Sequence, residues 1–314
     1  MGLWFKGKKQ SGWLALGLHA DHIDLVHVKR AASGRPEVAL CDSYRREGSE
    51  TEALSRLRKE FKLDRYRCTT LLHSDDYQMH QIDAPNVPAN ELKSAVSWKL
   101  KDMIEYPIEA ATIDVLDIPV DPNAPTRSHQ LYAVSASNEV IARCVRPFND
   151  AQVVLDAVDI PYLAQRNVAA LFEEPGRGVA MLAIYEHEGI LTFTSGGELF
   201  LARHIDVTLA QLTDADTERR NQVFERIALE LQRSLDNFDR AYQYVPISKL
   251  LLGPMPQDIG LQENLAANVY VPVESMDLAR VMDFPAVPEL KEAARQSQCL
   301  RYIGAALRGE DAVA

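Results

Sequence analysis

The order of its predicted secondary structure constrains this chain more than any single motif does, because one pattern occurs twice. Apolar and β-branched runs bounded by turns predict three short strands followed by a helix and a strand. The first copy has strands at 13–18, 23–29, 36–42 and 68–73 and a helix at 52–61, and the second opens with strands at 178–185, 190–194 and 199–204. Two such meanders, each continued by alternating helix and strand, predict a two-lobed α/β protein with a central cleft.

The second copy continues into the longest predicted helix, at 217–242. Its apolar side chains are three or four residues apart, which places them on one face of a helix. They are Val223, Ile227, Leu231, Leu235, Phe238 and Tyr242. Beyond this helix the sequence predicts strands at 249–252 and 268–273 and a final helix at 292–308.

A block with a different order separates the two copies. It contains predicted strands at 77–82, 111–118, 130–136 and 153–158 and helices at 90–106 and 139–148. This β-α-β-β-α-β order suggests an inserted α+β subdomain. The predicted division is a flexible basic N-terminus at 1–11, lobe 1 at 12–77 plus 158–174, the insert at 78–157, and lobe 2 at 178–314. Lobe 2 is expected to have a reduced small subdomain, because residues 206–221 are too few for a full one.

Composition excludes several classes of protein. The 314 residues carry a net charge of −11, so the overall field opposes binding to nucleic acid. The apolar runs are far shorter than the roughly 20 residues that a membrane-spanning helix needs, and no secretory signal is recognisable. The four cysteines, Cys41, Cys68, Cys144 and Cys299, lie far apart and form no metal-binding or redox motif. We therefore expect reduced thiols in a cytoplasmic protein.

Four segments in order resemble the PilM-type, actin-like proteins of type IV pilus assembly. They are residues 87–109, 157–167, 227–236 and 302–309. The most specific is 227–236, with the sequence Ile-Ala-Leu-Glu-Leu-Gln-Arg-Ser-Leu-Asp. The resemblance covers nearly the whole chain from Trp13. It implies a two-lobed actin-like fold of RNase H-like repeats with an inserted subdomain of the FtsA and PilM type.

The resemblance also implies a function. PilM-type proteins are scaffolds at the inner face of the inner membrane, where they bind the cytoplasmic tail of a PilN-like protein and help connect the assembly motor to the membrane platform. We therefore expect a scaffold of an MSHA-type pilus machine. Two alternatives stay open, an active ATP-binding ATPase of the same machinery with Mg²⁺ and a GspL-like scaffold of type II secretion. No membrane-spanning run precedes Ala314, which favours a separate membrane partner over the GspL-like alternative.

The nucleotide site of actin-like ATPases is expected to be degenerate here. Such enzymes hold phosphates with the backbone of two hairpin turns and place an Asp near the metal. On the family pattern, Gly17 falls at the first Asp position and His19 at a Gly position, with Asp21 nearby. The second turn carries Tyr at the close-approach position and the carboxylate of Glu186, and Pro follows Gly253 on the adenine side. We expect no ATP hydrolysis and no cofactor.

Other candidate sites are weaker. His19, Asp21, His22 and His27 could suggest a metal, but they lie in a turn and a strand without metal-ligand spacing, so no metal is expected. No catalytic triad is recognisable.

Trp98 lies off the apolar face of its predicted helix, which Leu92, Val96, Leu100 and Met103 form, so it is either packed under a neighbouring subdomain or presented to a partner. Because the resemblance places the partner's tail beside this helix, Trp98 is the candidate anchor. Five residues at the N-terminus suggest a peripheral membrane contact, namely Trp4, Phe5, Lys6, Lys8 and Lys9.

Overall fold

A computed structural model describes residues 9–31, 34–121 and 129–309. The chain divides into two units, unit 1 with residues 1–10 and 45–161 and unit 2 with residues 11–44 and 162–314. This grouping differs from the predicted lobes, because the first meander joins the C-terminal half. The reason is that the last helix, α8 (Ala293–Ala306), packs on β1 (Trp13–Leu18) and β2 (His22–Arg30).

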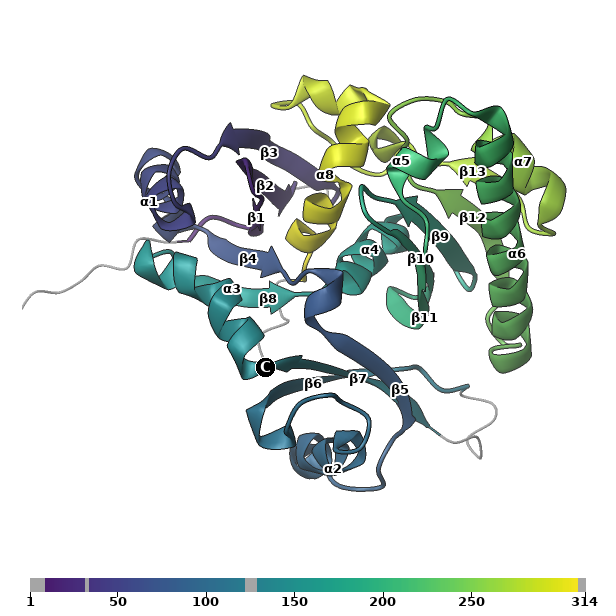
Figure 1. Ribbon diagram of the computed structural model, residues 1–314, viewed down its shortest axis with the longest axis horizontal. Coiled ribbons are helices and arrows are strands. Elements are labelled where there is room, and N and C mark those ends of the chain that lie inside the picture. Colours follow the sequence, from purple (N-terminus) through teal and green to yellow (C-terminus); the bar gives the residue numbers. More distant parts are fainter. Residues whose placement is uncertain (1–8, 32–33, 122–128, 310–314) are drawn as a thin grey trace, which may run out of the picture. The chain divides into compact units, whose positions relative to one another are not determined.

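The first meander of unit 2 matches its prediction closely. β1 and β2 pair antiparallel in a register that puts Gly17 opposite Asp24, and β3 (Pro36–Arg45) follows β2. β1 is buried along almost its whole length, so its run of apolar residues is a core strand with α8 against it (Figure 1).

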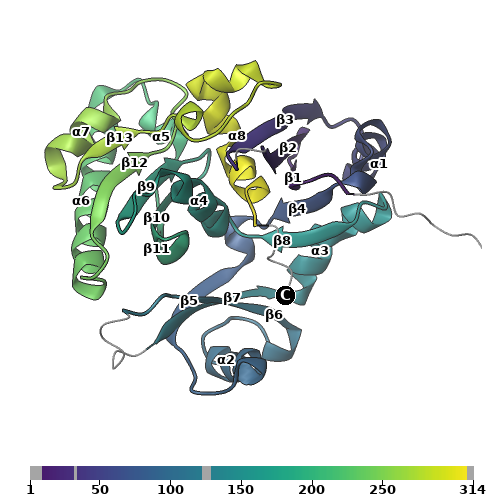
Figure 2. The same ribbon diagram turned by 180° about the vertical axis from the view of Figure 1, so that it is seen from behind.

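The second sheet of unit 2 repeats the meander. Its strand order is β11-β10-β9-β12-β13, with β9 (Gly178–Ile184), β10 (Gly189–Ser195), β11 (Glu198–Ile205), β12 (Ile247–Leu252) and β13 (Val273–Ser275). β9, β10 and β11 pair antiparallel, β12 pairs parallel with β9, and β13 pairs parallel with β12. The long helix α6 (Thr217–Ala241) lies beside this sheet and buries its predicted stripe from Ile227 to Phe238, whereas Phe224 is buried in place of the half-buried Val223 (Figure 2). Phe238 stacks on Phe193 with ring centroids 4.7 Å apart.

Helix α4 (Pro161–Ala169) is hydrogen-bonded through its side chains both to the second sheet and to α8. Gln165 is buried and donates its side-chain amide to the carbonyls of Met181 and Ile190, both at 2.9 Å. Asn167 donates to the Gly304 carbonyl of α8 at 2.9 Å. Gly304 is required there, because a Cβ would lie 2.2 Å from the Ala164 carbonyl oxygen. The close approach of α4 and α8 fixes where the last helix lies in this unit.

Unit 1 contains a parallel strand pair and a small antiparallel sheet. β4 (Arg67–Leu71) pairs with β8 (Leu155–Asp159), and α1 (Glu50–Phe61) packs on α3 (Asn138–Asp150). A capping box of Ser49 and Glu52 begins α1. The antiparallel sheet has the order β5-β7-β6, with β5 (Gln78–Asp83), β6 (Ala111–Asp117) and β7 (Gln130–Ser137). It corresponds to the predicted insert.

Helices α2 (Leu92–Leu100) and α3 cover opposite faces of this small sheet (Figure 1). Val96 and Leu100 of α2 form a core cluster with side chains of one face, including Ile113 of β6. The neighbouring residue Thr112 points to the other face and lies beside α3, as alternation along a strand requires.

Two predicted elements need correction. Helix α2 ends at Leu100, six residues before its predicted end, since the chain there turns so that Ile104 rather than Met103 packs on the core cluster. The predicted strand at 268–273 begins only at Val273. Residues 261–268 instead form helix α7 (Leu261–Asn268), because Leu261 and Leu265 are one turn apart and both buried. Helices α4 and α7, together with the short α5 (Leu209–Leu212), are additions to the predicted elements.

Within the described ranges, no helix combines the length and the apolar composition that crossing a membrane would need.

Candidate functional site

Two hairpin tips and two neighbouring residues of α8 form the candidate site in unit 2. The β1–β2 tip is closed by a hydrogen bond of 2.9 Å from the His19 amide to the His22 carbonyl. In the β9–β10 tip, the Tyr185 amide donates to the Glu188 carbonyl at 2.7 Å. Tyr302 of α8 contacts the first tip and Arg301 contacts the second. Adjacent residues of one helix therefore contact the two tips.

At the first tip, the contact with α8 is made by an aromatic side chain. The Tyr302 hydroxyl forms a hydrogen bond of 3.0 Å with His19 Nε2, and the two rings meet edge to face. Gly17 leaves room for this ring, because a Cβ there would lie 2.1 Å from Tyr302 Cζ. Burial raises the pKa of Tyr302 far above its usual value, so the hydroxyl keeps its proton.

At the second tip, the contact with α8 is an ion pair. Arg301 donates to Glu188 Oε1 at 2.7 Å, and its guanidinium lies over the Tyr185 ring, 4.1 Å from the centroid. His204 Nδ1 approaches the other oxygen of Glu188 at 3.4 Å. Burial raises the pKa of Tyr185 to about 12. The tip is thus a buried ion pair stacked on a neutral phenol.

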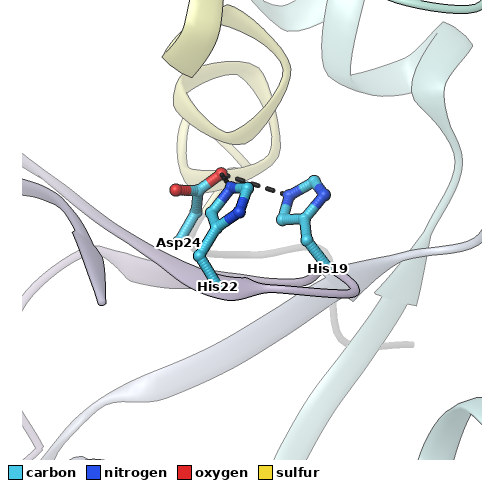
Figure 3. A group of neighbouring side chains, drawn as sticks. All are labelled: His19, His22 and Asp24. Carbon is cyan, nitrogen blue, oxygen red and sulfur yellow. Dashed lines mark ion pairs between the residues drawn. The ribbon is translucent and has the colours of Figure 1, made fainter. Parts of the chain in front are cut away.

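Two imidazoles and a carboxylate gather on the same side of the first tip (Figure 3). Asp24 Oδ2 lies 3.2 Å from His19 Nε2 and 3.6 Å from His22 Nε2. The imidazole rings stack nearly parallel, with centroids 4.3 Å apart. Burial raises the pKa of Asp24, but hydrogen bonds from His19 and Ser43 outweigh burial and hold it below its usual value. The carboxylate is therefore ionised at neutral pH.

The other predicted cleft positions lie near these tips but take different roles. Asp21 is exposed and hydrogen-bonds His22 Nδ1 at 2.7 Å. Glu186 projects into solvent with 85% of its side chain exposed. Gly253 follows β12, and its amide already donates to the Leu182 carbonyl at 2.7 Å. His27 is buried in β2, away from the cluster, and bonds the Ser11 carbonyl.

Sequence reasoning missed three residues of this site: Asp24, Arg301 and Tyr302. A signal for Asp24 was present, because residues two apart on a strand share a face and His22 precedes it by two. No local signal marked Arg301 or Tyr302, whose partners Glu188 and His19 lie 113 and 283 residues away in sequence.

Trp98 of unit 1 is presented rather than packed, with 77% of its surface exposed. Lys101 lies over its ring, 5.8 Å from the centroid. A groove of about 440 Å³ lies between α3 and β6, on the opposite face of the small sheet. Its wall includes the half-buried apolar side chains Ile141 and Val145 and the charged Arg146 and Asp150. Unit 1 thus has two separate candidate surfaces, the exposed Trp98 and the groove beside α3.

Of the N-terminal residues predicted to touch a membrane, Trp4, Phe5, Lys6 and Lys8 lie outside the described residues. Lys9 is described, and its ammonium pairs with Asp156 at 2.8 Å.

Comparison with solved structures decides the fold. The chain matches a chain of the PilM–PilN type IV pilus biogenesis complex with a TM-score of 0.67 and 21% identity, over 93% of this chain and 98% of that one. The chain has a PilM-type actin-like fold. The predicted fold class is confirmed.

Two weaker likenesses accompany the match to the PilM–PilN complex. The cytoplasmic domain of EpsL, from the type II secretion system of Vibrio cholerae, matches at a TM-score of 0.47 and 14% identity, over 92% of this chain and 94% of that one. A Bacteroides thetaiotaomicron protein with an actin-like ATPase fold matches at 0.49 and 12% identity, over 90% and 96%. No protein-family model and no curated protein matches the chain.

Proposed function

We propose that this chain is a scaffold of type IV pilus assembly that binds the cytoplasmic tail of a PilN-like inner-membrane protein at the inner face of that membrane. The observation that carries the proposal is the match to a chain of the PilM–PilN complex over almost the full length of both chains. The sequence resemblance refines it to the MSHA-type pilus and its biogenesis protein MshI, with a link to the assembly motor. A membrane contact through the N-terminus belongs to the same proposal.

The tail is proposed to bind unit 1, with Trp98 as the anchor. Trp is one of the residue types, with Tyr and Arg, that are enriched in the hot spots of protein interfaces. Its exposure also means that its removal leaves no cavity in the core, so binding and folding can be measured separately. The groove beside α3 is the competing surface, and it lies on the opposite face of the sheet.

Calorimetric titration of a synthetic peptide with the sequence of the tail tests this assignment. We expect Trp98→Ala to weaken binding by about 2 kcal/mol, roughly 30-fold, with an unchanged melting temperature. Tyr270→Ala is the matched control, since Tyr270 is an aromatic residue of unit 2 with 58% exposure. Val145→Glu tests the groove by placing a charge on its apolar wall.

Each outcome decides between surfaces. Loss of binding in Val145→Glu with normal binding in Trp98→Ala would move the tail to the groove. Loss in Tyr270→Ala alone would place the tail in unit 2. A peptide that binds none of these proteins, at any concentration reached, would contradict the scaffold function itself.

The nucleotide site is proposed to be degenerate, so that the protein acts without ATP hydrolysis. Two contacts support this. The Tyr302 ring lies against Gly17 at the first tip, and the Arg301–Glu188 pair fills the second. A triphosphate would meet a phenol at one tip and buried and exposed carboxylates at the other. ATP turnover above the buffer rate that is lost in Asp21→Ala or Glu186→Ala would instead favour an active ATPase that binds ATP with Mg²⁺.

A further inference from the structure

We propose that His19, His22 and Asp24 bind one divalent transition-metal ion, with Zn²⁺ as the ion that fits best. All three come from the β1–β2 hairpin, and one ligand atom of each lies within 4.8 Å of the others. The antiparallel register brings the strand residue Asp24 beside the turn residue His19, although five positions separate them in sequence. The site is independent of the proposed pilus function.

The distances suit a tetrahedral ion. Ligands at 2.0–2.1 Å from Zn²⁺ lie about 3.3 Å from one another at the corners of a tetrahedron. Asp24 Oδ2 is 3.2 Å from His19 Nε2 and 3.6 Å from His22 Nε2, so two edges already have nearly this length. The third edge, between the two imidazoles, is within 4.8 Å, and because the rings stack nearly parallel, one of them must rotate to bring both lone pairs to the ion. Two imidazole nitrogens and one carboxylate oxygen form a donor set suited to Zn²⁺, whereas Mg²⁺ prefers oxygen ligands alone.

Outer hydrogen bonds orient two of the three ligands. The Asp21 carboxylate accepts from His22 Nδ1 at 2.7 Å, which fixes the proton on Nδ1 and leaves the lone pair on Nε2 for a metal. Ser43 donates to Asp24 Oδ1, so Oδ2 is the oxygen that faces the imidazoles. Arg295 in turn donates to the Ser43 hydroxyl at 3.3 Å.

Tyr302 makes a specific prediction for this site. Its hydroxyl lies 3.0 Å from His19 Nε2, the nitrogen that the metal would use. A metal bound at this nitrogen would have to displace the hydrogen bond of the Tyr302 hydroxyl. Three protein ligands then leave the fourth position open to water or a small anion. We therefore expect Tyr302→Phe to bind Zn²⁺ at least as tightly as the wild type.

The test uses tag-free, full-length protein titrated with Zn²⁺ against a chromogenic chelator. We expect one ion per chain, and His19→Ala or His22→Ala should weaken binding by about 100-fold or more. Asp21→Asn should weaken it by about 10-fold, because it removes only an outer partner. His187→Ala is the matched control, since His187 is an exposed histidine of the other tip and should bind as the wild type does.

Two further measurements separate this site from others. Co²⁺ in place of Zn²⁺ should show the visible absorption of a tetrahedral nitrogen–oxygen site, and the melting temperature should rise with Zn²⁺ but not with Mg²⁺. Binding that survives in both His19→Ala and His22→Ala would place the ion elsewhere, for example on the thiols. A preference for Mg²⁺, or no ion retained by the wild type, would overturn the proposal and leave the cluster as ion pairs alone.

Discussion

The two hairpin tips of unit 2 come from the same strand pattern and meet adjacent residues of one helix, yet different chemistry closes them. At the β1–β2 tip, a neutral phenol meets a partly exposed imidazole through one hydrogen bond. At the β9–β10 tip, a guanidinium meets a carboxylate that is only 9% exposed.

The two contacts therefore differ in whether a ligand could replace them. A single hydrogen bond is worth about 1 kcal/mol, so a ligand that binds His19 can replace the Tyr302 contact. Breaking a buried ion pair leaves a charge without a partner and costs several times more. The first tip is therefore the better place for a ligand, whereas the ion pair stabilises the second tip.

The largest expected effect is at the second tip. Glu188→Ala should lower the free energy of unfolding by about 3 kcal/mol, because it leaves the Arg301 guanidinium, 20% exposed, without its carboxylate. Glu186→Ala removes a carboxylate of the same hairpin that lies in solvent, and it should change stability by less than about 0.5 kcal/mol. Denaturant unfolding of both variants compares them. Equal losses would mean that the ion pair does not hold the tip.

A smaller effect is expected at the first tip. Tyr302→Phe keeps the ring against Gly17 and removes only the hydrogen bond to His19, so it should cost about 1 kcal/mol in metal-free protein. Tyr270→Phe removes an exposed hydroxyl that bonds Asp239 and should cost less. If Tyr302→Phe lowered the free energy of unfolding as much as Glu188→Ala does, the two tips would not differ in the way proposed here.

The smallest effect is a pH dependence of the first meander. Burial lowers the pKa of His27 below its usual value, and the hydrogen bond to the Ser11 carbonyl only partly opposes this. Below about pH 6.5 the unfolded chain therefore takes up a proton that the folded chain resists, and stability falls as the pH falls. Above that pH this contribution is constant. Melting curves from pH 7.5 to 5.5 should show a flatter decline in His27→Gln, and an unchanged slope would contradict the assignment.

Much of the fold could be predicted because it depends on local pattern. β1 lies where its apolar run predicts, and α6 follows its stripe to within one residue of the predicted end. Prediction failed where a turn or a tertiary contact decided the end of an element. Leu261 and Leu265 are too few apolar residues to indicate α7 by periodicity, and α2 ends early so that Ile104 can pack on the sheet.

The sequence by itself determined that a polar turn with two histidines lies between the first two strands, and that this turn departs from the phosphate-binding pattern of the actin-like ATPases. Only the tertiary structure decided what that turn contacts. Strand register brings Asp24 beside His19 and His22, and the packing of α8 on β1 and β2 brings Tyr302 and Arg301 to the two tips. Contacts of this kind depend on how distant apolar faces pack, which leaves no mark in the local sequence of the residues that meet.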